Sequence, residues 1–344
     1  MPVTRTTLLG GPASATFGGR TFFAQDGILI TPALELEAVD SDAQGVLDAT
    51  ATFSKPMTIQ FTPTAPFADL LTLYPFLAGE PGASLFGGVD SPLVFVAANG
   101  VRLTFAAVAI VQMPDLSLTT RGVVAGAVTF VALGARTLPI TAENRLVTID
   151  TAAVPVPSTM PPQLSDDFEI TWGAGGTGSG PWMQLRAMDG VTVKFAMKSS
   201  PVISAANAVV DLTLDSLAVT ASFIPATPSG PAEVDVFAAL QVQGALPGRL
   251  LSQGANTLEI AGEHLFFRMP LAQLTQGPLR FDATHPRVGE WVFTATRVAL
   301  SAEPMLDGLV GLTEGKPLKT KSLERRTGNR FTPRPFPEFY ALTS

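Results

Sequence analysis

Residues 93–133 read LVFVAANGVRLTFAAVAIVQMPDLSLTTRGVVAGAVTFVAL, and this stretch decides the fold because a weaker copy of it returns at residues 256–296. Each copy is typical of a β-hairpin followed by a polar connection and a further strand. Val101, Leu103 and Phe105 alternate with more polar residues, which is the period of a strand with a buried face. A core that occurs twice in one chain predicts two versions of one domain.

Five separated segments repeat along the chain at an offset of 162 or 163 residues. The pairs are 9–11 with 172–174, 24–28 with 187–191, 57–63 with 219–225, 99–105 with 261–267, and 126–132 with 289–295. One common offset over five segments indicates an internal duplication.

The duplication divides the 344 residues into four parts. We expect a first domain at residues 1–150, a proline-rich linker at 151–165, a second domain at 166–303 and an arm at 304–344. Domains of about 150 residues are large enough to bury a core of their own.

Short local signals place turns and helices within each copy. The dipeptides Asp26-Gly27 and Asp189-Gly190 stand between apolar runs, which predicts a two-residue hairpin turn at each. After Pro66, the apolar residues recur at helical spacing and predict an amphipathic helix at residues 67–77. A weaker pattern after Pro231 predicts its counterpart. The expected fold is mainly β, with two tandem β-sandwich or barrel domains, one flanking α-helix in each, and a C-terminal arm.

The composition bounds the class of partner. Hydrophobic residues make up 46% of the chain and charged residues only 15%, so much of the surface is weakly polar, which favours assembly with other subunits. The net charge of −7 excludes the basic footprint of a protein that grips DNA, and it suits a surface along which nucleic acid slides. Cysteine is absent, which excludes disulfides and thiolate chemistry. The sequence predicts no secretory signal and no membrane span.

The motifs that could carry chemistry are weak. Gly173 to Gly178 satisfies the spacing G-x-G-x-x-G, but Pro181 follows where a dinucleotide site needs a helix, so we expect a flexible loop like residues 10–19 of the first copy. His264 and His285 are the only histidines and stand at unrelated positions, which argues against a histidine metal cluster. The sequence has no G-x-S-x-G elbow. We therefore expect no catalytic residue, no cofactor and no metal, and a chain that is not an enzyme.

The C-terminal arm is basic and rich in aromatic residues. The residues that characterise it are Lys316, Lys319, Lys321, Arg325, Arg326, Phe331, Phe336, Phe339 and Tyr340. Such an arm can bind nucleic acid, or it can dock on an acidic neighbouring subunit. Docking is favoured because the rest of the chain is acidic, and we expect the arm to bridge successive rings of an assembly.

These features resemble the major tail tube proteins of long-tailed (siphovirus-like) bacteriophages, in particular the subfamily with two tandem tube domains in each subunit. The residues that carry the resemblance are the five matched segments, the hairpin at 93–111, the helix at 67–77 with its equivalent, and Met113-Pro114-Asp115-Leu116 before residues 126–133. The resemblance covers about residues 3–300.

The resemblance implies a tail-tube-like sandwich in each domain and a trimeric ring with pseudo-sixfold symmetry. Stacked head to tail, such rings form a hollow conduit through which DNA passes during ejection without specific binding. The implied partners are further copies of the chain and other tail proteins, namely the tape measure, the terminator and the baseplate. The implied location is the virion tail, assembled in the cytoplasm of the bacterial host.

Other functions remain open on the sequence. A related non-enzymatic part, such as a tail terminator, a distal tail or baseplate ring, or the tube of an injection machine, fits the same pattern. A carbohydrate-binding or adhesin-like β-sandwich module belongs to a different class, and 3 Trp and 2 Tyr offer few aromatic platforms for it. A β-rich enzyme needs a convergent polar pocket, which the sequence does not indicate.

Overall fold

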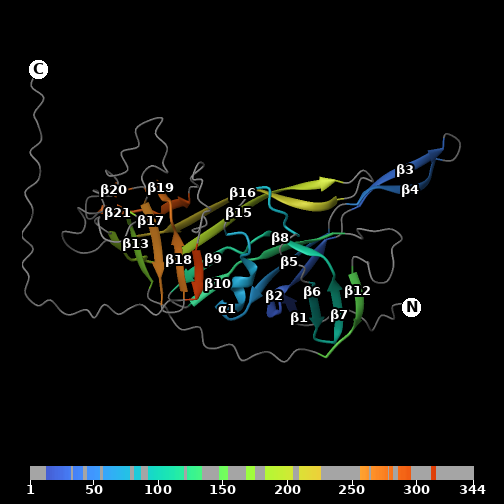
Figure 1. The fold of residues 1–344 in the computed structure, drawn as a ribbon, viewed down its shortest axis with the longest axis horizontal. Coiled ribbons are helices and arrows are strands. Elements are labelled where there is room, and N and C mark those ends of the chain that lie inside the picture. The colour runs from blue at the N-terminus through green and yellow to red at the C-terminus, as the bar shows by residue number, and fades with distance from the viewer. Residues whose placement is uncertain are drawn as a thin grey trace, which may run out of the picture.

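The computed structural model describes residues 13–31, 34–41, 45–54, 57–77, 81–86, 92–119, 122–133, 147–153, 168–174, 183–203, 209–225, 256–262, 265–277, 279–281, 286–295 and 311–314. The chain is mainly β, as the sequence predicts, and every strand pair in the described residues is antiparallel (Figure 1). We call the part from β1 to β12 the first half and the part from β13 to β23 the second half.

Three large sheets and two isolated hairpins contain these strands. The eight-stranded sheet, in the order β12-β7-β6-β1-β2-β5-β11-β8, contains β1 (Ala13–Phe17), β2 (Arg20–Thr31), β5 (Met57–Thr64), β6 (Leu93–Ala97), β7 (Val101–Phe105), β8 (Val108–Gln112), β11 (Val128–Ala132) and β12 (Val147–Thr151). The six-stranded sheet, in the order β10-β9-β15-β16-β22-β19, contains β9 (Leu116–Thr119), β10 (Gly122–Ala125), β15 (Val191–Ile203), β16 (Val209–Phe223), β19 (Ala272–Gln276) and β22 (Trp291–Ala295). The five-stranded sheet, in the order β14-β13-β17-β18-β23, contains β13 (Glu169–Ala174), β14 (Met183–Leu185), β17 (Asn256–Ala261), β18 (Leu265–Met269) and β23 (Gly311–Glu314). The hairpins are β3 (Leu34–Ser41) with β4 (Gly45–Ser54), and β20 (Leu279–Phe281) with β21 (Pro286–Val288).

The eight-stranded sheet curls over its own core. Phe17 on β1 and Phe130 on β11 have ring centroids 4.9 Å apart, although two strands separate β1 from β11 in the sheet. In a flat sheet, strands three positions apart lie about 14 Å from each other. The rings therefore meet only because the sheet bends until its two ends face each other across the core.

The second half closes its core with two separate sheets. Trp172 of the five-stranded sheet meets Phe293 of the six-stranded sheet edge to face, with ring centroids 5.3 Å apart. The indole Nε1 of Trp172 donates a hydrogen bond to the carbonyl oxygen of Ala272 at 3.2 Å, which satisfies the buried polar end of that side chain. The two sheets thus pack face to face around aromatic residues.

The strand pairings of the first half recur in the second half at nearly constant offset. Leu29 stands opposite Gln60, and Thr192 and Ser222, which lie 163 and 162 residues later, also stand opposite each other. Irregularities in the ladders recur as well: Glu35/Leu36 with Lys198/Ser199, Val39/Asp40 with Val202/Ile203, and Ile110/Gln112 with Leu274/Gln276. Shared bulges at matched positions are strong evidence of a common architecture, because a bulge is a specific local feature.

The aromatic contacts repeat in the same way. Phe61 and Phe130 stack with ring centroids 5.9 Å apart, and Phe223 and Phe293 stack at 5.6 Å. Phe130 also meets Phe17 at an interplanar angle of 68°, and Phe293 meets Trp172 at 67°. β1 is therefore the counterpart of β13, and the expected loop at residues 10–19 is wrong for residues 13–17, which form β1.

Asp26-Gly27 is not the hairpin turn that the sequence predicts. The dipeptide lies inside β2, at an irregularity between Gln25 and Ile28 where β2 continues to pair with β5. Gly27 has φ +87°, a backbone conformation that favours glycine. A bulge and a tight turn ask for the same residue types, so the sequence pattern does not separate them. Asp189-Gly190 forms a bend before β15, and the Ala187–Pro225 bridge beside it matches the pairing of Ala24 with Pro63.

The helix after Pro66 is shorter than predicted. It comprises α1 (Phe67–Leu70) and a 3₁₀ turn, η1 (Leu71–Leu73), instead of residues 67–77. Pro75 explains the early end because a proline disfavours helical conformation in the residue before it. Leu70, Leu73 and Tyr74 are buried, so the predicted apolar stripe does face the core. The second helix, expected after Pro231, lies outside the described residues.

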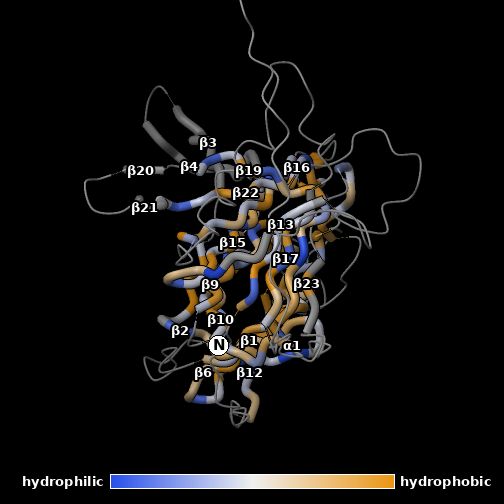
Figure 2. The backbone as a smooth tube through the Cα atoms, turned by 90° about the vertical axis from the view of Figure 1, so that its left-hand side faces the viewer, coloured by the Kyte–Doolittle hydropathy of each residue, from blue (hydrophilic) through white to orange (hydrophobic). Residues whose placement is uncertain are grey.

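Hydrophobic residues line the strands of both halves (Figure 2), and one continuous cluster of buried residues runs through the two halves. Residues 311–314, which the sequence assigns to the arm, form β23 and pair with β18. The sheet of the second half therefore extends into the predicted arm. Within the described residues, no helix has the length and apolar character needed to cross a membrane.

Candidate assembly interface

The two halves are joined by a sheet junction. The β9–β10 hairpin belongs to the first half in sequence, yet β9 pairs with β15 and so forms the edge of the six-stranded sheet of the second half. In its register, Leu118 stands opposite Val191, Ser117 opposite Thr192, and Leu116 opposite Val193. Main-chain pairing of this kind is a common mode by which one protein surface extends another.

Apolar side chains seal this junction. Leu116 and Leu118 of β9 are fully buried, and so are Val191 and Val193 of β15. Burial of each such side chain stabilises by about 1.5–3 kcal/mol as an upper estimate. The junction therefore has the energetics of a domain core.

Gly190 allows the main chains to approach each other closely at the start of β15. Its φ is +97°, and a Cβ atom built on it would overlap the carbonyl oxygen of Leu118. The neighbour is backbone that is already held in the junction, so it cannot move aside at low cost. Glycine is therefore required at this position on two grounds, its conformation and its contact.

Asp115 and Tyr74 fix the segment that leads into β9. The Oδ1 atom of Asp115 accepts a hydrogen bond from the main-chain nitrogen of Phe195 at 3.2 Å, and its carbonyl oxygen accepts one from Gly126 at 2.7 Å. The Tyr74 hydroxyl donates to the carbonyl oxygen of Pro114 at 2.9 Å, and its ring lies on Phe195 with centroids 5.1 Å apart. Burial, and secondarily the nearby Asp115 carboxylate, raise the pKa of Tyr74 well above its ordinary value, so the phenol stays neutral.

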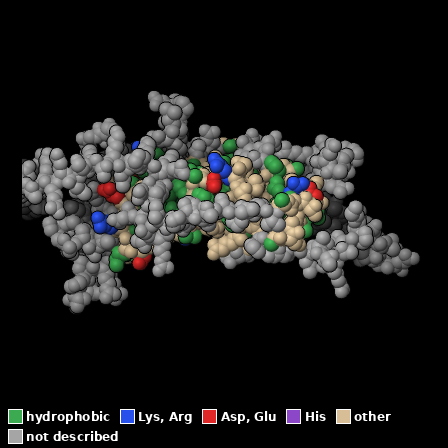
Figure 3. Space-filling view, turned by 90° about the horizontal axis from the view of Figure 1, so that it is seen from below, with side chains coloured by type: hydrophobic (Ala, Val, Ile, Leu, Met, Phe, Trp, Pro, Cys, Tyr) green, Lys and Arg blue, Asp and Glu red, His purple; other side chains and the backbone are tan. Residues whose placement is uncertain are grey.

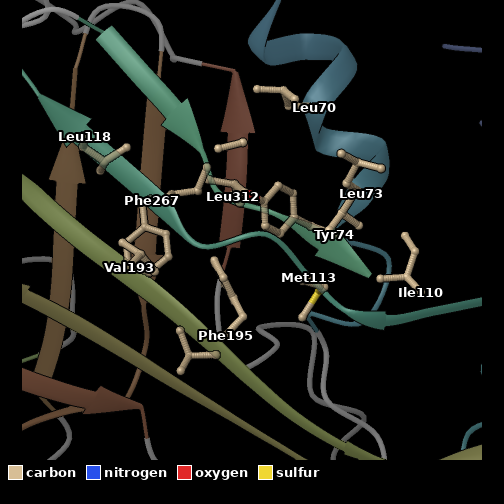
Figure 4. Close-up of a cluster of buried hydrophobic side chains, with 14 of the residues drawn as sticks. Leu70, Leu73, Tyr74, Ile110, Met113, Leu118, Val193, Phe195, Phe267 and Leu312 are labelled. Carbon is tan, nitrogen blue, oxygen red and sulfur yellow. The ribbon is translucent and has the colours of Figure 1, made fainter. Parts of the chain in front are cut away.

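Figure 4 shows the cluster of side chains around this junction. Leu70, Leu73 and Tyr74 come from the helical segment of the first half, and Met113 comes from the segment that leads into β9. Phe195 reaches the cluster from β15 and Leu312 from β23, both in the second half. All of these residues belong to one buried cluster, so the halves share a core instead of touching at two finished surfaces.

A second contact lies farther along the β15–β16 hairpin. The main chain of residues 81–86 runs beside β16, with Leu85 donating to the carbonyl oxygen of Leu212 at 2.8 Å and Leu214 donating to that of Ala83 at 2.9 Å. The Ser84 hydroxyl donates to the Oδ1 atom of Asp211 at 2.8 Å. A separate buried cluster fills the space beneath: Leu85, Phe86, Ala109, Val131, Leu133, Val209, Leu212 and Leu214. The outer faces of β8 and β11 are thus covered by the second half of the same chain.

The predicted docking residues of the arm, Lys316 to Tyr340, lie outside the described residues, as do His264, His285 and most of the glycine-rich loop after β13. In the part of the chain that the structure describes, no three His, Asp or Glu side chains come together as metal ligands would. The β9–β15 junction was missed by the sequence analysis. The signal for it is the apolar alternation Leu116-Ser117-Leu118 together with the glycine before β15.

Comparison with known proteins gives no relative. No protein-family model matches the chain, and no curated protein sequence matches it.

Proposed function

We propose that this chain is a structural protein of a phage tail tube, made of two tandem tube domains, which assembles as trimeric, pseudo-hexameric rings. The rings stack head to tail into a hollow conduit for DNA, with the tape measure, terminator and baseplate proteins as partners, in a virion tail assembled in the host cytoplasm. The observation that carries the proposal is the repeated architecture, with bulges and aromatic pairs at matched positions in the two halves.

The geometry of the junction supports a ring. The first half contributes its β9–β10 hairpin, and the second half contributes a different element, the edge of β15. A contact between unlike surfaces of equivalent domains has no two-fold axis, so its repetition produces a ring or an open filament. Three chains with two equivalent domains each would close such a ring with pseudo-sixfold symmetry.

The surface suits an assembled conduit. In the view of Figure 3, charged side chains are sparse among the described residues. Several large apolar side chains are exposed on the single chain: Leu29, Val124, Ile149, Met188, Val202 and Ile203. Such positions favour burial by neighbouring subunits, and an acidic chain of net charge −7 does not retain DNA that passes along it.

Negative-stain electron microscopy of the purified chain, together with its mass in solution, tests the proposal. We expect hollow tubes or rings of three chains. A chain that stays monomeric at high concentration contradicts the proposal. Rings that never stack support the related alternative of a single-ring tail component, such as a terminator or a baseplate ring, which the same junction allows.

A further inference from the structure

The chain carries a second copy of each surface that forms its internal junction. β20 and β21 pair with each other, and no other strand among the described residues pairs with them. Within the described residues, the edge of β2 that faces away from β5 also has no strand partner at Ile28–Thr31. In Figure 1, β20 and β21 lie near one end of the long axis, and β3, which continues from β2, lies at the other.

The β20–β21 hairpin corresponds to β9–β10. Leu279 to Phe281 lie 163 residues after Leu116 to Leu118, and both segments follow a strand with the same ladder irregularity. The apolar, polar, apolar pattern is the same in both. This hairpin is therefore an equivalent of the junction hairpin that has no acceptor edge within the described chain.

The open edge of β2 corresponds to the acceptor edge of β15. Ile28 to Ile30 lie 163 residues before Val191 to Val193. Val191 and Val193 are buried under β9, whereas Ile28 and Ile30 are only half-buried and Leu29 between them is 60% exposed. The difference in exposure is what a missing hairpin would cause.

We propose that β20 of one copy pairs antiparallel with β2 of a second copy, with Phe281 opposite Ile28, Arg280 opposite Leu29 and Leu279 opposite Ile30. This register repeats the internal pairing of β9 with β15. The inference rests on the ring assembly proposed above and specifies its contact between subunits.

A polar contact of the internal junction is absent from both sides of this second junction. Internally, the main-chain nitrogen of Phe195 donates to Asp115. The residue 163 positions before Phe195 is Pro32, which has no N–H to donate. The segment from Gln276 to Leu279 is one residue shorter than that from Gln112 to Leu116, and with Pro278 aligned to Pro114 the aspartate is the missing position. Donor and acceptor are thus lost together, as expected if these two surfaces meet each other.

Gly27 supplies a second independent indication. It lies 163 positions before Gly190 and shares its positive φ, +87° against +97°. In the single chain a Cβ atom on Gly27 would have nothing within 4 Å, whereas on Gly190 it would overlap the Leu118 carbonyl oxygen. In the proposed junction, the carbonyl oxygen of Phe281 takes the place of that of Leu118.

Cysteine pairs test the register, because the natural chain has no cysteine. Leu29→Cys and Arg280→Cys are made as separate proteins, mixed under assembly conditions and oxidised. Antiparallel partners have Cα atoms about 4.5–5.5 Å apart, within disulfide range. We expect a covalent dimer from the mixture of the two variants. Leu29→Cys mixed with Leu279→Cys is the control, since a shift of one residue turns the side chain to the other face of the sheet.

Two alanine variants separate folding from assembly. Gly27→Ala is expected to raise the protein concentration needed for assembly at least tenfold while the isolated chain still folds. Gly190→Ala is expected to weaken the fold of the isolated chain itself. The Ser117→Cys, Thr192→Cys double variant is the positive control, since this pair stands opposite within one chain and closes an internal disulfide.

The outcomes distinguish this inference from the proposed function. Tubes or rings without the Leu29–Arg280 crosslink overturn the register and leave the tube function standing. The crosslink without rings or tubes supports the pairing and contradicts the tube function. Absence of both the assemblies and the crosslink contradicts both.

Discussion

Tyr74 is the residue at which the chemistry of the junction can be measured directly. Its hydroxyl donates to the Pro114 carbonyl oxygen, and its raised pKa keeps it protonated in the folded chain. The unfolded chain loses this proton near pH 10, so the free energy of unfolding should fall as the pH rises above about 10. Tyr74→Phe leaves the Pro114 carbonyl without its donor and should lower stability by about 1–3 kcal/mol at neutral pH.

The Tyr74 prediction is checked by urea unfolding of the wild-type chain and of Tyr74→Phe between pH 7 and 11. The variant should lose less stability at high pH, because it has no phenol to titrate at that position. Tyr340 is the only other tyrosine, so in a Tyr340→Phe background the phenolate absorbance reports on Tyr74 alone. A midpoint near pH 10 in the folded chain would contradict the assigned environment.

At the scale of elements, the segment at residues 81–86 fastens the β15–β16 hairpin to the first half. Leu85 is buried in the smaller core cluster, so Leu85→Ala should cost about 2–5 kcal/mol of local stability. Hydrogen exchange should then accelerate at the amides of Gly82, Leu85 and Leu214, which bond across this contact. Amides of the β6–β7 hairpin serve as the control and should keep their protection. Equal loss of protection in both places would mean that the contact is not a separate unit.

The elements that the sequence predicts well are those set by local pattern. The hairpin of β6 and β7, the apolar face of α1 and the position of the repeat follow from alternation and helical spacing, which survive duplication. The bulge at Gly27 could not be told from a turn, because both need a positive φ. The helix end at Leu73 follows from Pro75, which the apolar pattern of residues 67–77 does not take into account.

The junction was beyond reach of local pattern for a different reason. Leu116 meets Val193 only because the two halves share one core, and their separation along the chain gives no periodic signal. The alternation of Leu116 and Leu118 indicates a half-buried strand, but it does not say which strand lies beside it. Pairing partners of edge strands are a tertiary property, so they come from the structure.

At the scale of the whole molecule, the basic arm is expected to bridge rings, because its charge opposes that of the acidic body. Deleting residues 317–344 should leave ring formation intact and give shorter tubes that grow more slowly. Added salt should have the same effect on the full chain, since it screens attraction between exposed charges. Tube length by electron microscopy and growth rate by light scattering provide the measurement. Tubes of wild-type length and rate would rule out the bridging role.

The shared core between the halves has a kinetic consequence. Because β9 reaches β15 within one chain, that contact forms during folding and does not wait for an encounter between molecules. Tethered surfaces meet at an effective concentration on the order of millimolar, far above that of a dilute protein. In a ring of such chains, half of the contacts between domains are closed before assembly begins. Nucleation should then depend on protein concentration with a lower power than it would for separate domains, so the fused chain assembles at a lower concentration.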